Sequence, residues 1–304
     1  MKFNEAQEQA IRHIDGPCLV LAGPGSGKTA VITDRTRYLI EEAGIHPANI
    51  LVVTFTKAAA MEMQERFRTK MQGANVPCTF GTFHSIFFWI LRRAYGYTGN
   101  QIVSEEEKRK ILTELVQKME LEYEDEEEFI QNLIGEITLV KSEYMPIEHY
   151  YSTTCGEAEF RQLYQSYQER IQSEGKLDFD DMLVYTYELL KERPDICRQW
   201  QEKFQYILID EFQDINYIQY EIVRMLSGDR KNLFVVGDDD QSIYRFRGAR
   251  PEIMLGFTKD YPEAEVILLN VNYRSSREIV EGSLRMIANN TKRYDKEIRS
   301  EQPY

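Results

Sequence analysis

A glycine-rich segment, AGPGSGKT, directly follows an apolar run at residues 18–22 and ends in Lys28 and Thr29. Glycines let backbone N–H groups turn towards a phosphate, and a helix after the loop adds its positive N-terminal end. Lys28 is then expected to reach the β- and γ-phosphates of a nucleotide, and the Thr29 hydroxyl to bind Mg²⁺. A glycine-rich turn without function is the alternative, which the intact Gly-Lys-Thr ending disfavours. A strict phosphate-loop pattern would have glycine at the first position, where this chain has Ala22. The predicted nucleotide-binding residues of the loop are Ala22, Gly23, Pro24, Gly25, Ser26, Gly27, Lys28, Thr29 and Ala30.

A second apolar run, at residues 206–209, ends in two carboxylates, Asp210 and Glu211. A phosphate loop needs such an acidic strand end. Asp210 is expected to bind Mg²⁺ through its outer coordination shell, and Glu211 to orient and deprotonate the attacking water. A strand that ends in Asp-Glu says little alone, but together with the phosphate loop it indicates ATP hydrolysis. A small GTPase is disfavoured, because the chain has no Asn-Lys-x-Asp motif for reading guanine.

Short apolar runs predict the strands that must position these residues, at 18–22, 50–55, 206–209, 233–236 and 266–269. Helical patterns lie between several of these runs, at 57–71 and 85–95. Apolar strands separated by helices indicate a parallel sheet that is buried on both faces. An α/β fold is therefore expected.

Residues 92–176 differ, because their pattern is helical and charged without convincing strands. Ser104 and Glu107 have the spacing of a capping box, and apolar residues follow at helical spacing. We interpret this section as a helical insertion in the α/β domain, and a separate helical domain is disfavoured because strands resume afterwards. The roughly 180 positions between Lys28 and Asp210 also exceed what a minimal phosphate-loop domain needs.

The last section of the chain opens a new strand–helix unit, in which Ser275 and Glu278 give a second capping-box signature. One strand and one helix cannot bury a core of their own. We therefore expect the chain to be truncated at this end or to need a partner.

The composition is that of a soluble protein, with 42% hydrophobic and 29% charged residues among 304. No apolar run is long enough to span a membrane, and the N-terminus lacks the apolar stretch of a signal peptide. The four cysteines form no Cys-x-x-Cys pair. A cytoplasmic location is therefore expected, without disulfides, zinc or iron–sulfur ligation. The net charge of −13 disfavours nucleic acid as a partner, but basic clusters at 65–70, 91–93 and 244–250 leave a local basic groove open.

Eight segments, in the same order as in a known family, resemble the superfamily 1 DNA helicases of the UvrD, PcrA and Rep type. They are FNEAQEQA, AGPGSGKT, TFTKAAAMEMQERF, GTFHSIFFWILRR, LDFDDML, ILIDEFQD, VVGDDDQSIYRFRGA and LNVNYRS. The resemblance covers almost the whole chain and implies a RecA-like phosphate-loop fold with ATP and Mg²⁺ as ligands. It implies residues 1–91 and 177–270 as the first motor domain, 92–176 as its helical insertion, and 271–304 as the start of a second RecA-like domain.

Besides Lys28 and Glu211, the resemblance implies a nucleotide-binding role for Gln7 and catalytic roles for Gln241 and Arg274. Gln7 would hydrogen-bond adenine, Gln241 would sense the γ-phosphate, and Arg274 would act as an arginine finger from the second motor domain. An arginine there offsets the charge that spreads over the transferred phosphoryl oxygens. Without the resemblance, a surface arginine beside a helix N-cap is the simpler interpretation of Arg274.

For DNA, the resemblance implies a strand-binding track made of Phe55, Thr56, His84, Tyr244 and Phe246. Unstacked bases stack on aromatic faces regardless of sequence, at about 1–3 kcal/mol per base. Hydroxyls and basic groups hold the phosphates. The alternative is that Phe55 and Phe246 only fill the core.

Two residues depart from the family pattern. Phe246 stands where tryptophan is usual, which gives a smaller stacking surface of the same kind. Ala30 follows the phosphate-loop threonine where many members have arginine, so one nucleotide contact is expected to be missing.

Three consecutive aspartates, Asp238 to Asp240, precede Gln241 and at first suggest a metal cluster. Because the magnesium role is already assigned, these aspartates are expected to anchor the loop at the strand end instead. The short link from Gln241 to the aromatic residues after it would then make this segment a relay between phosphate and DNA.

Together these features predict an ATP-dependent DNA helicase or translocase that acts on single-stranded DNA and on duplex/single-strand junctions. The 3′→5′ direction follows from the resemblance alone. Two alternatives stay open, a nucleotide- or DNA-binding module without motor activity and a motor subunit of a helicase–nuclease complex. Family members that work inside nuclease complexes tend to alter the GDDDQSIY segment, so the resemblance implied by its intact form favours a stand-alone motor over the second alternative.

Overall fold

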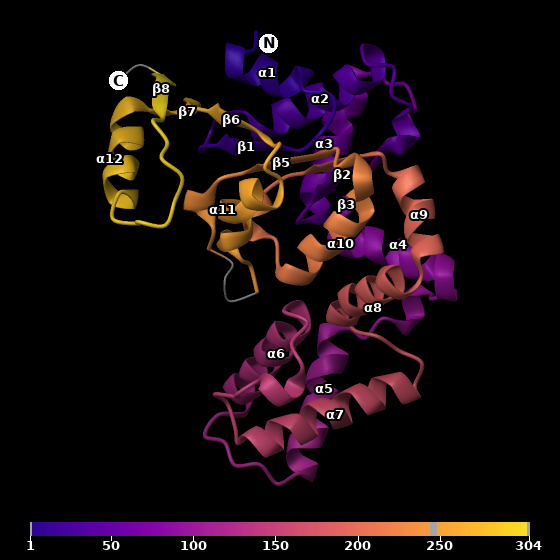
Figure 1. The fold of residues 1–304 in the computed structure, drawn as a ribbon. Helices are drawn as coiled ribbons and strands as arrows, with labels where there is room; N and C mark the ends of the chain where they lie inside the picture. Colours follow the sequence, from indigo (N-terminus) through magenta and orange to yellow (C-terminus); the bar gives the residue numbers. More distant parts are fainter. Residues whose placement is uncertain (1, 244–247, 303–304) are drawn as a thin grey trace.

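A six-stranded parallel sheet forms the centre of the protein (Figure 1). The structure is a computed structural model that describes residues 2–243 and 248–302. The strands run in the spatial order β3-β2-β4-β5-β1-β6, and all neighbouring strands are parallel. They are β1 (Cys18–Ala22), β2 (Ile50–Thr54), β3 (Thr79–Thr82), β4 (Tyr206–Ile209), β5 (Leu233–Gly237) and β6 (Glu265–Leu269). The expected α/β fold with a parallel sheet is thus confirmed.

Helices cover both faces of this sheet. On one face they are α1 (Glu5–Arg12), α2 (Lys28–Glu41) and α3 (Lys57–Lys70). On the other they are α4 (Phe83–Tyr95), α8 (Phe179–Glu192), α9 (Pro194–Lys203), α10 (Tyr217–Ser227) and α11 (Pro251–Asp260). Single 3-10 turns lie in the connections, namely η1 (Pro47–Asn49), η2 (Gly99–Gln101), η3 (Ile147–His149), η4 (Phe212–Asp214), η5 (Gly228–Arg230) and η6 (Asp239–Gln241). None of the helices in the described ranges combines the length and apolarity needed to cross a membrane.

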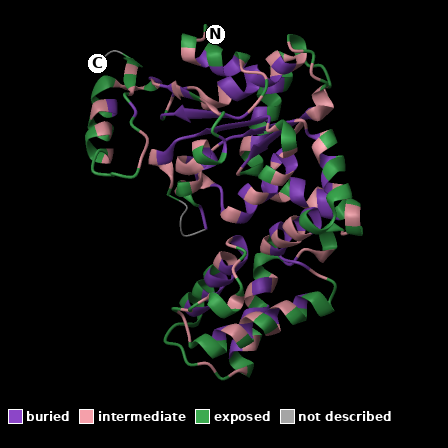
Figure 2. Cartoon of the chain, in the orientation of Figure 1, coloured by how far each residue is buried: buried purple, intermediate pink, exposed green. Residues whose placement is uncertain are grey.

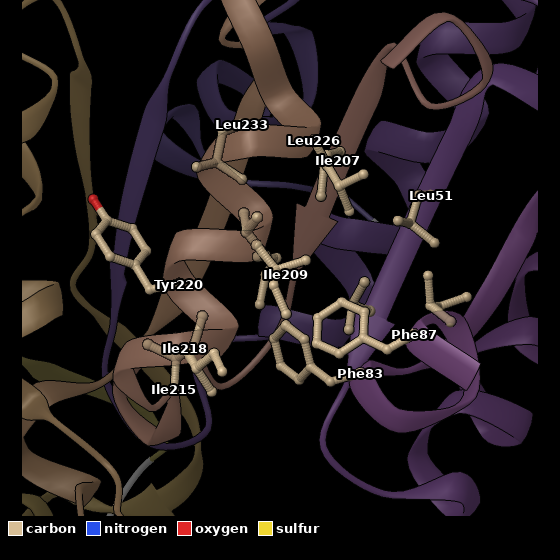
Figure 3. Close-up of a cluster of buried hydrophobic side chains, with 14 of the residues drawn as sticks. Leu51, Phe83, Phe87, Ile207, Ile209, Ile215, Ile218, Tyr220, Leu226 and Leu233 are labelled. Carbon is tan, nitrogen blue, oxygen red and sulfur yellow. The ribbon is translucent and has the colours of Figure 1, made fainter. Parts of the chain in front are cut away.

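The core lies in two layers, one on each face of the sheet. Side chains alternate along β1, so that Leu19 and Leu21 join the layer under α4 and α10 while Val20 joins the opposite layer. Figure 3 shows the first layer, where Phe83 and Phe87 of α4 pack against apolar side chains from β2, β4 and α10. Each fully buried side chain of this size contributes about 1.5–3 kcal/mol through apolar burial. This rigid base holds the loops at the carboxyl ends of the strands.

A helical lobe lies apart from the sheet (Figure 1). It contains α5 (Glu105–Lys118), α6 (Glu126–Ser142) and α7 (Glu157–Ser173), which share a separate hydrophobic core. Figure 2 shows that the buried residues of these helices face one another while their outer faces are exposed. The lobe interrupts the α/β domain between β3 and β4, within the range 92–176 that the sequence predicts to be an insertion.

Buried ion pairs fasten this lobe to α8. The Nζ atom of Lys141, on α6, lies 2.9 Å from Asp178 and 2.8 Å from Asp181. Lys108, on α5, lies 2.9 Å from Asp180. All of these side chains except Asp180 are almost fully buried, so each charge depends on its partners for solvation.

The C-terminal unit comprises β7 (Val271–Ser276), α12 (Arg277–Ile287) and β8 (Arg299–Gln302). Its two strands pair in parallel and form a sheet separate from the central one. In α12 only Val280 is buried, whereas Ile279 and Met286 are 61% and 72% exposed. As expected from the sequence, the unit has almost no core of its own, and it packs instead on the phosphate loop and the end of β5.

Two helix starts differ from the capping boxes expected from the sequence. Ser104 caps α5 by accepting from the Glu107 N–H, but the Glu107 carboxylate binds Lys176 at 2.6 Å instead of returning to the cap. At the second site α12 begins one residue later than expected, after Ser276 and without a side-chain cap, because Ser275 is the penultimate residue of β7.

Candidate nucleotide site and nucleic-acid track

The phosphate loop joins the end of β1 to the start of α2. Gly25 and Gly27 have φ angles of 68° and 86°, in the left-handed region that favours glycine. Gly27 is the N-cap of α2 and offers no side-chain cap, so the first N–H groups of the helix stay available to an anion. The hydroxyl of Ser26 is buried and has no hydrogen-bond partner among the described residues. These features fit a phosphate group bound by the loop.

Gln7 lies against this loop. Its side chain is buried, and Nε2 donates to the carbonyl oxygen of Ser26 at 2.9 Å. Its Oε1 accepts from the Asn4 N–H at 3.1 Å, so both ends of the amide are engaged and adenine would have to replace one of these bonds. A cavity of about 210 Å³ adjoins the loop and is lined by Lys2, Gln7, Gly25, Gly27, Ala30, Tyr273 and Arg274.

Lys28 and Glu211 form an ion pair across the carboxyl edge of the sheet, with 2.8 Å between Nζ and Oε2. The Glu211 side chain is 38% exposed, whereas that of Lys28 is only 13% exposed, so the carboxylate can turn towards solvent while the ammonium stays beside the loop. A phosphate could therefore displace the carboxylate from Lys28. Glu211 also has a φ of 50°, which is strained for a residue other than glycine and is typical of functional positions.

Asp210 is buried at the end of β4, and its backbone neighbour Glu211 donates an N–H to its Oδ1 at 3.0 Å. Burial, together with the charge of Glu211, raises the pKa of Asp210 to about 6. The same causes raise the pKa of Asp214 to about 6. Lys28 offsets only part of this negative charge, and a bound cation would offset more of it.

Thr29 lies on the first turn of α2, directly after Lys28, and can offer its hydroxyl on the same edge as Asp210. Within the described ranges, no group of three or more His, Cys, Asp or Glu side chains could hold a metal ion. One hydroxyl and one carboxylate nevertheless fit Mg²⁺, which keeps most of its waters and takes further oxygens from substrate phosphates.

Arg274, in β7, lies beside the phosphate loop. The Tyr273 N–H donates to the carbonyl oxygen of Gly25 at 3.0 Å, and a Cβ atom on Gly25 would stand only 2.7 Å from the Arg274 Cβ. A Cβ on Gly23 would likewise clash with the side chain of Ile298. The Arg274 side chain is exposed and makes no hydrogen bond or ion pair within residues 2–243 and 248–302. Its charge is thus free to meet a ligand in the cavity.

A continuous chain of hydrogen bonds connects the phosphate loop to Gln241. Gln213 donates through Nε2 to Glu211 at 2.9 Å and accepts at Oε1 from the Asp238 N–H at 2.9 Å. The Asp238 carboxylate then accepts from Nε2 of Gln241 at 2.7 Å. The sequence interpretation overlooked Gln213, although it lies only two residues after Glu211 in the DEFQD segment.

The predicted DNA-binding residues with described positions lie near the carboxyl ends of β2 and β3. Phe55 is half-buried and packs edge-on against Phe83 with ring centroids 5.4 Å apart, which agrees with the core-filling alternative. Thr56 is exposed and caps α3 by accepting from the Ala59 N–H at 3.1 Å.

His84 has an aromatic neighbour that the sequence interpretation missed. The His84 ring lies 5.7 Å from that of Phe179, which is 42% exposed at the start of α8. Burial lowers the pKa of His84, which favours the neutral form of its imidazole. Tyr244 and Phe246 lie outside the described residues.

The fold and this site define a phosphate-loop domain with an acidic strand end and an inserted helical lobe. Residues 3–262 match the family model described as "UvrD/REP helicase N-terminal domain", and the chain belongs to that family.

Curated relatives match along the same range. The chain is 41% identical to YjcD of Bacillus subtilis, over 97% of this chain and 40% of that protein. It is 37% identical to "ATP-dependent DNA helicase Rep" of Escherichia coli, over 100% of this chain and 46% of that protein. It is 38% identical to "ATP-dependent DNA helicase PcrA" of Bacillus subtilis, over 98% of this chain and 41% of that protein. The chain thus spans less than half the length of these relatives.

Proposed function

We propose that this chain is the N-terminal part of an ATP-dependent DNA helicase or translocase that moves 3′→5′ on single-stranded DNA. The observation that carries the proposal is the chain of hydrogen bonds from Lys28 to Gln241, which joins the phosphate loop to the segment expected to meet DNA. The names of Rep and PcrA support both the use of ATP and the DNA substrate.

In this proposal Lys28 exchanges the partly exposed carboxylate of Glu211 for the β- and γ-phosphates, which carry more negative charge. Glu211 is then free to accept a proton from the attacking water, while Gln213 holds its Oε2 in place. Thr29 and Asp210 would hold Mg²⁺, which when bound offsets the negative charge of the phosphates. Arg274 would offset the charge that develops on the transferred group.

Gln241 would respond to the γ-phosphate, as the resemblance to the family implies. Its amide now binds Asp238, so contact with a phosphate would break or redirect that bond. In the sequence, Gln241 is followed closely by Tyr244 and Phe246, the residues proposed to stack on bases. A shift at Gln241 would therefore move the DNA-binding residues, which couples hydrolysis to movement.

We also propose the cytoplasm as the location, with single-stranded DNA and duplex/single-strand junctions as the partners. The four cysteines are all free thiols, which suits a reducing compartment. Burial raises the pKa of Cys18 and of Cys78 to about 12, so these two thiols are unreactive and suited to packing.

An unwinding assay tests the proposal. The full-length protein is mixed with duplexes that carry either a 3′ or a 5′ single-stranded tail, with and without ATP and Mg²⁺. We expect strand separation on the 3′-tailed duplex only, and only with ATP. DNA binding without ATP turnover would instead identify a binding module, cleaved strands would indicate a helicase–nuclease, and preference for the 5′ tail would reverse the proposed direction.

A further inference from the structure

The three consecutive aspartates after β5 (Asp238 to Asp240, the aspartate loop) surround a single lysine from the C-terminal unit. Nζ of Lys296 lies 2.6 Å from Oδ1 of Asp238, 2.6 Å from Oδ1 of Asp239 and 2.9 Å from Oδ2 of Asp240. The Lys296 side chain is completely buried. Its ammonium therefore offsets the negative charge of all three carboxylates.

Two further contacts complete the attachment of the aspartate loop to the C-terminal unit. Arg293 binds Asp240 with two parallel hydrogen bonds of 2.8 and 2.6 Å. The Tyr294 N–H donates to Oδ2 of Asp239 at 2.7 Å. Each of the three carboxylates is thus held by residues 293–296, which lie more than 50 positions further along the chain.

The charges in this cluster depend on one another. Burial opposes the charge of Lys296, but the three aspartates raise its pKa above the ordinary value, so the ammonium form is kept. Burial likewise disfavours the charge of Asp240, yet Arg293 and Lys296 hold its pKa below the ordinary value. Without Lys296, the buried carboxylates of Asp238 and Asp239 would lose the ammonium that both contact at 2.6 Å, and removing one partner of a buried ion pair is strongly destabilising.

Asp238 connects Lys296 to Gln241. Its Oδ1 contacts Lys296, and its Oδ2 accepts from Nε2 of Gln241 at 2.7 Å. Asp239 also contacts Lys296 at 2.6 Å, but its second oxygen accepts from the Tyr294 N–H rather than from Gln241. The two aspartates thus share the same lysine but only Asp238 orients the amide of Gln241.

The geometry points to Lys296 as a positioning residue for Gln241, acting through the carboxylate of Asp238. This role rests on the proposed function, in which Gln241 senses the γ-phosphate. The same C-terminal unit carries Arg274 beside the phosphate loop. Docking of this unit therefore places the arginine and orients Gln241 in one step, and its departure releases both.

The test compares variants of the full-length protein by kcat and KM for ATP hydrolysis at saturating oligo-dT. We expect K296M to lower kcat at least tenfold while KM for ATP changes less than threefold, and K296R to recover most of the loss. K231M is the control, since Lys231 forms an exposed ion pair with Glu263 far from the site. A K296M variant that turns over like K231M would overturn the proposal.

A second comparison separates positioning from folding and applies even if K296M does not fold. D238N and D239N each remove one buried carboxylate from Lys296. We expect D238N to lose at least fivefold more kcat than D239N, whereas a purely structural cluster predicts equal losses that follow the melting temperatures. If the parent protein shows no ATP hydrolysis, the proposed function fails. If the parent hydrolyses ATP but K296M does not differ from K231M, nor D238N from D239N, only the role of Lys296 is rejected.

Discussion

Nζ of Lys28 and Oε2 of Glu211 lie 2.8 Å apart, although the two residues are 183 positions apart in the chain. One belongs to the phosphate loop after β1 and the other follows β4. The contact joins the residue expected to hold phosphate to the residue expected to activate water. In the proposed function, a phosphate bound to Lys28 would release the Glu211 carboxylate from this contact.

Glu211→Gln should therefore retain ATP binding and lose turnover. The amide keeps the shape of the side chain but cannot accept a proton from water, so we expect kcat to fall by about 10²–10⁴-fold. The measurement is DNA-stimulated phosphate release by the full-length protein, with Glu202→Gln as an exposed control. Turnover at the parent rate in the Glu211 variant would remove this residue from the role of base.

Arg274→Ala should lower kcat on the order of 10³-fold, because the arginine would offset charge that develops only in the transition state. Arg274 makes no contact with a described side chain that its loss would leave unpaired, so the melting temperature should hardly change. Arg285→Ala, on the exposed face of α12, is the matched control. A loss of stability with unchanged kcat would show that Arg274 is only a surface arginine.

Asp210→Asn should stabilise the chain at neutral pH in buffer without divalent cations. The folded-state pKa of Asp210 is about 6 against an ordinary 3.8, so the folded chain keeps this proton where the unfolded chain has lost it. The free energy of unfolding therefore falls as pH rises from 4 to 6, by about 3 kcal/mol for the full shift of the Asp210 pKa. Asparagine removes this penalty.

The corresponding measurement is the melting temperature as a function of pH. The difference between Asp210→Asn and the parent should be near zero at pH 4 and reach its full positive value by pH 7. Asp229→Asn, at an exposed position, should show no such trend. A destabilised Asp210 variant at pH 7 would contradict burial as the cause.

Lys141→Met should destabilise the attachment of the helical lobe. The ammonium lies between Asp178 and Asp181, and its removal leaves their charges buried without this partner. Breaking a buried pair in this way lowers the free energy of unfolding by about 3–5 kcal/mol. Urea unfolding followed by circular dichroism measures the change, with Lys118→Met at an exposed position of α5 as the control. Equal effects of the two substitutions would show that the buried pairs carry no net stability.

Much of the central sheet could be predicted from the sequence, because its buried strands are short unbroken apolar runs. Strand β3 was missed, since only Gly81 of its four residues is buried and the strand has no apolar run. The start of α12 was misplaced because a capping-box spacing does not show whether the serine still belongs to the preceding strand.

The candidate site was predictable where its residues lie in contiguous motifs, as for Lys28, Asp210 and Glu211. Contacts between side chains that are distant in the sequence could not be predicted. No periodicity or spacing indicates which lysine contacts the aspartate loop. Lys296 reaches Asp238 across 58 positions, and only the folded chain brings them together. The loop was expected to be an anchor, but its partner could not be named from the sequence.

The most direct measurement is ATP hydrolysis by the full-length protein with and without single-stranded oligo-dT, compared with Lys28→Ala. In the proposed function the lysine meets the phosphates with a charge that water cannot replace, so its loss should lower DNA-stimulated turnover by about 10²–10³-fold. Lys231→Ala, at a distant surface position, should behave like the parent. Hydrolysis that rises with oligo-dT in the parent and is lost in Lys28→Ala is the predicted result. Hydrolysis that ignores DNA, or that survives in Lys28→Ala, would contradict a DNA motor driven from this phosphate loop.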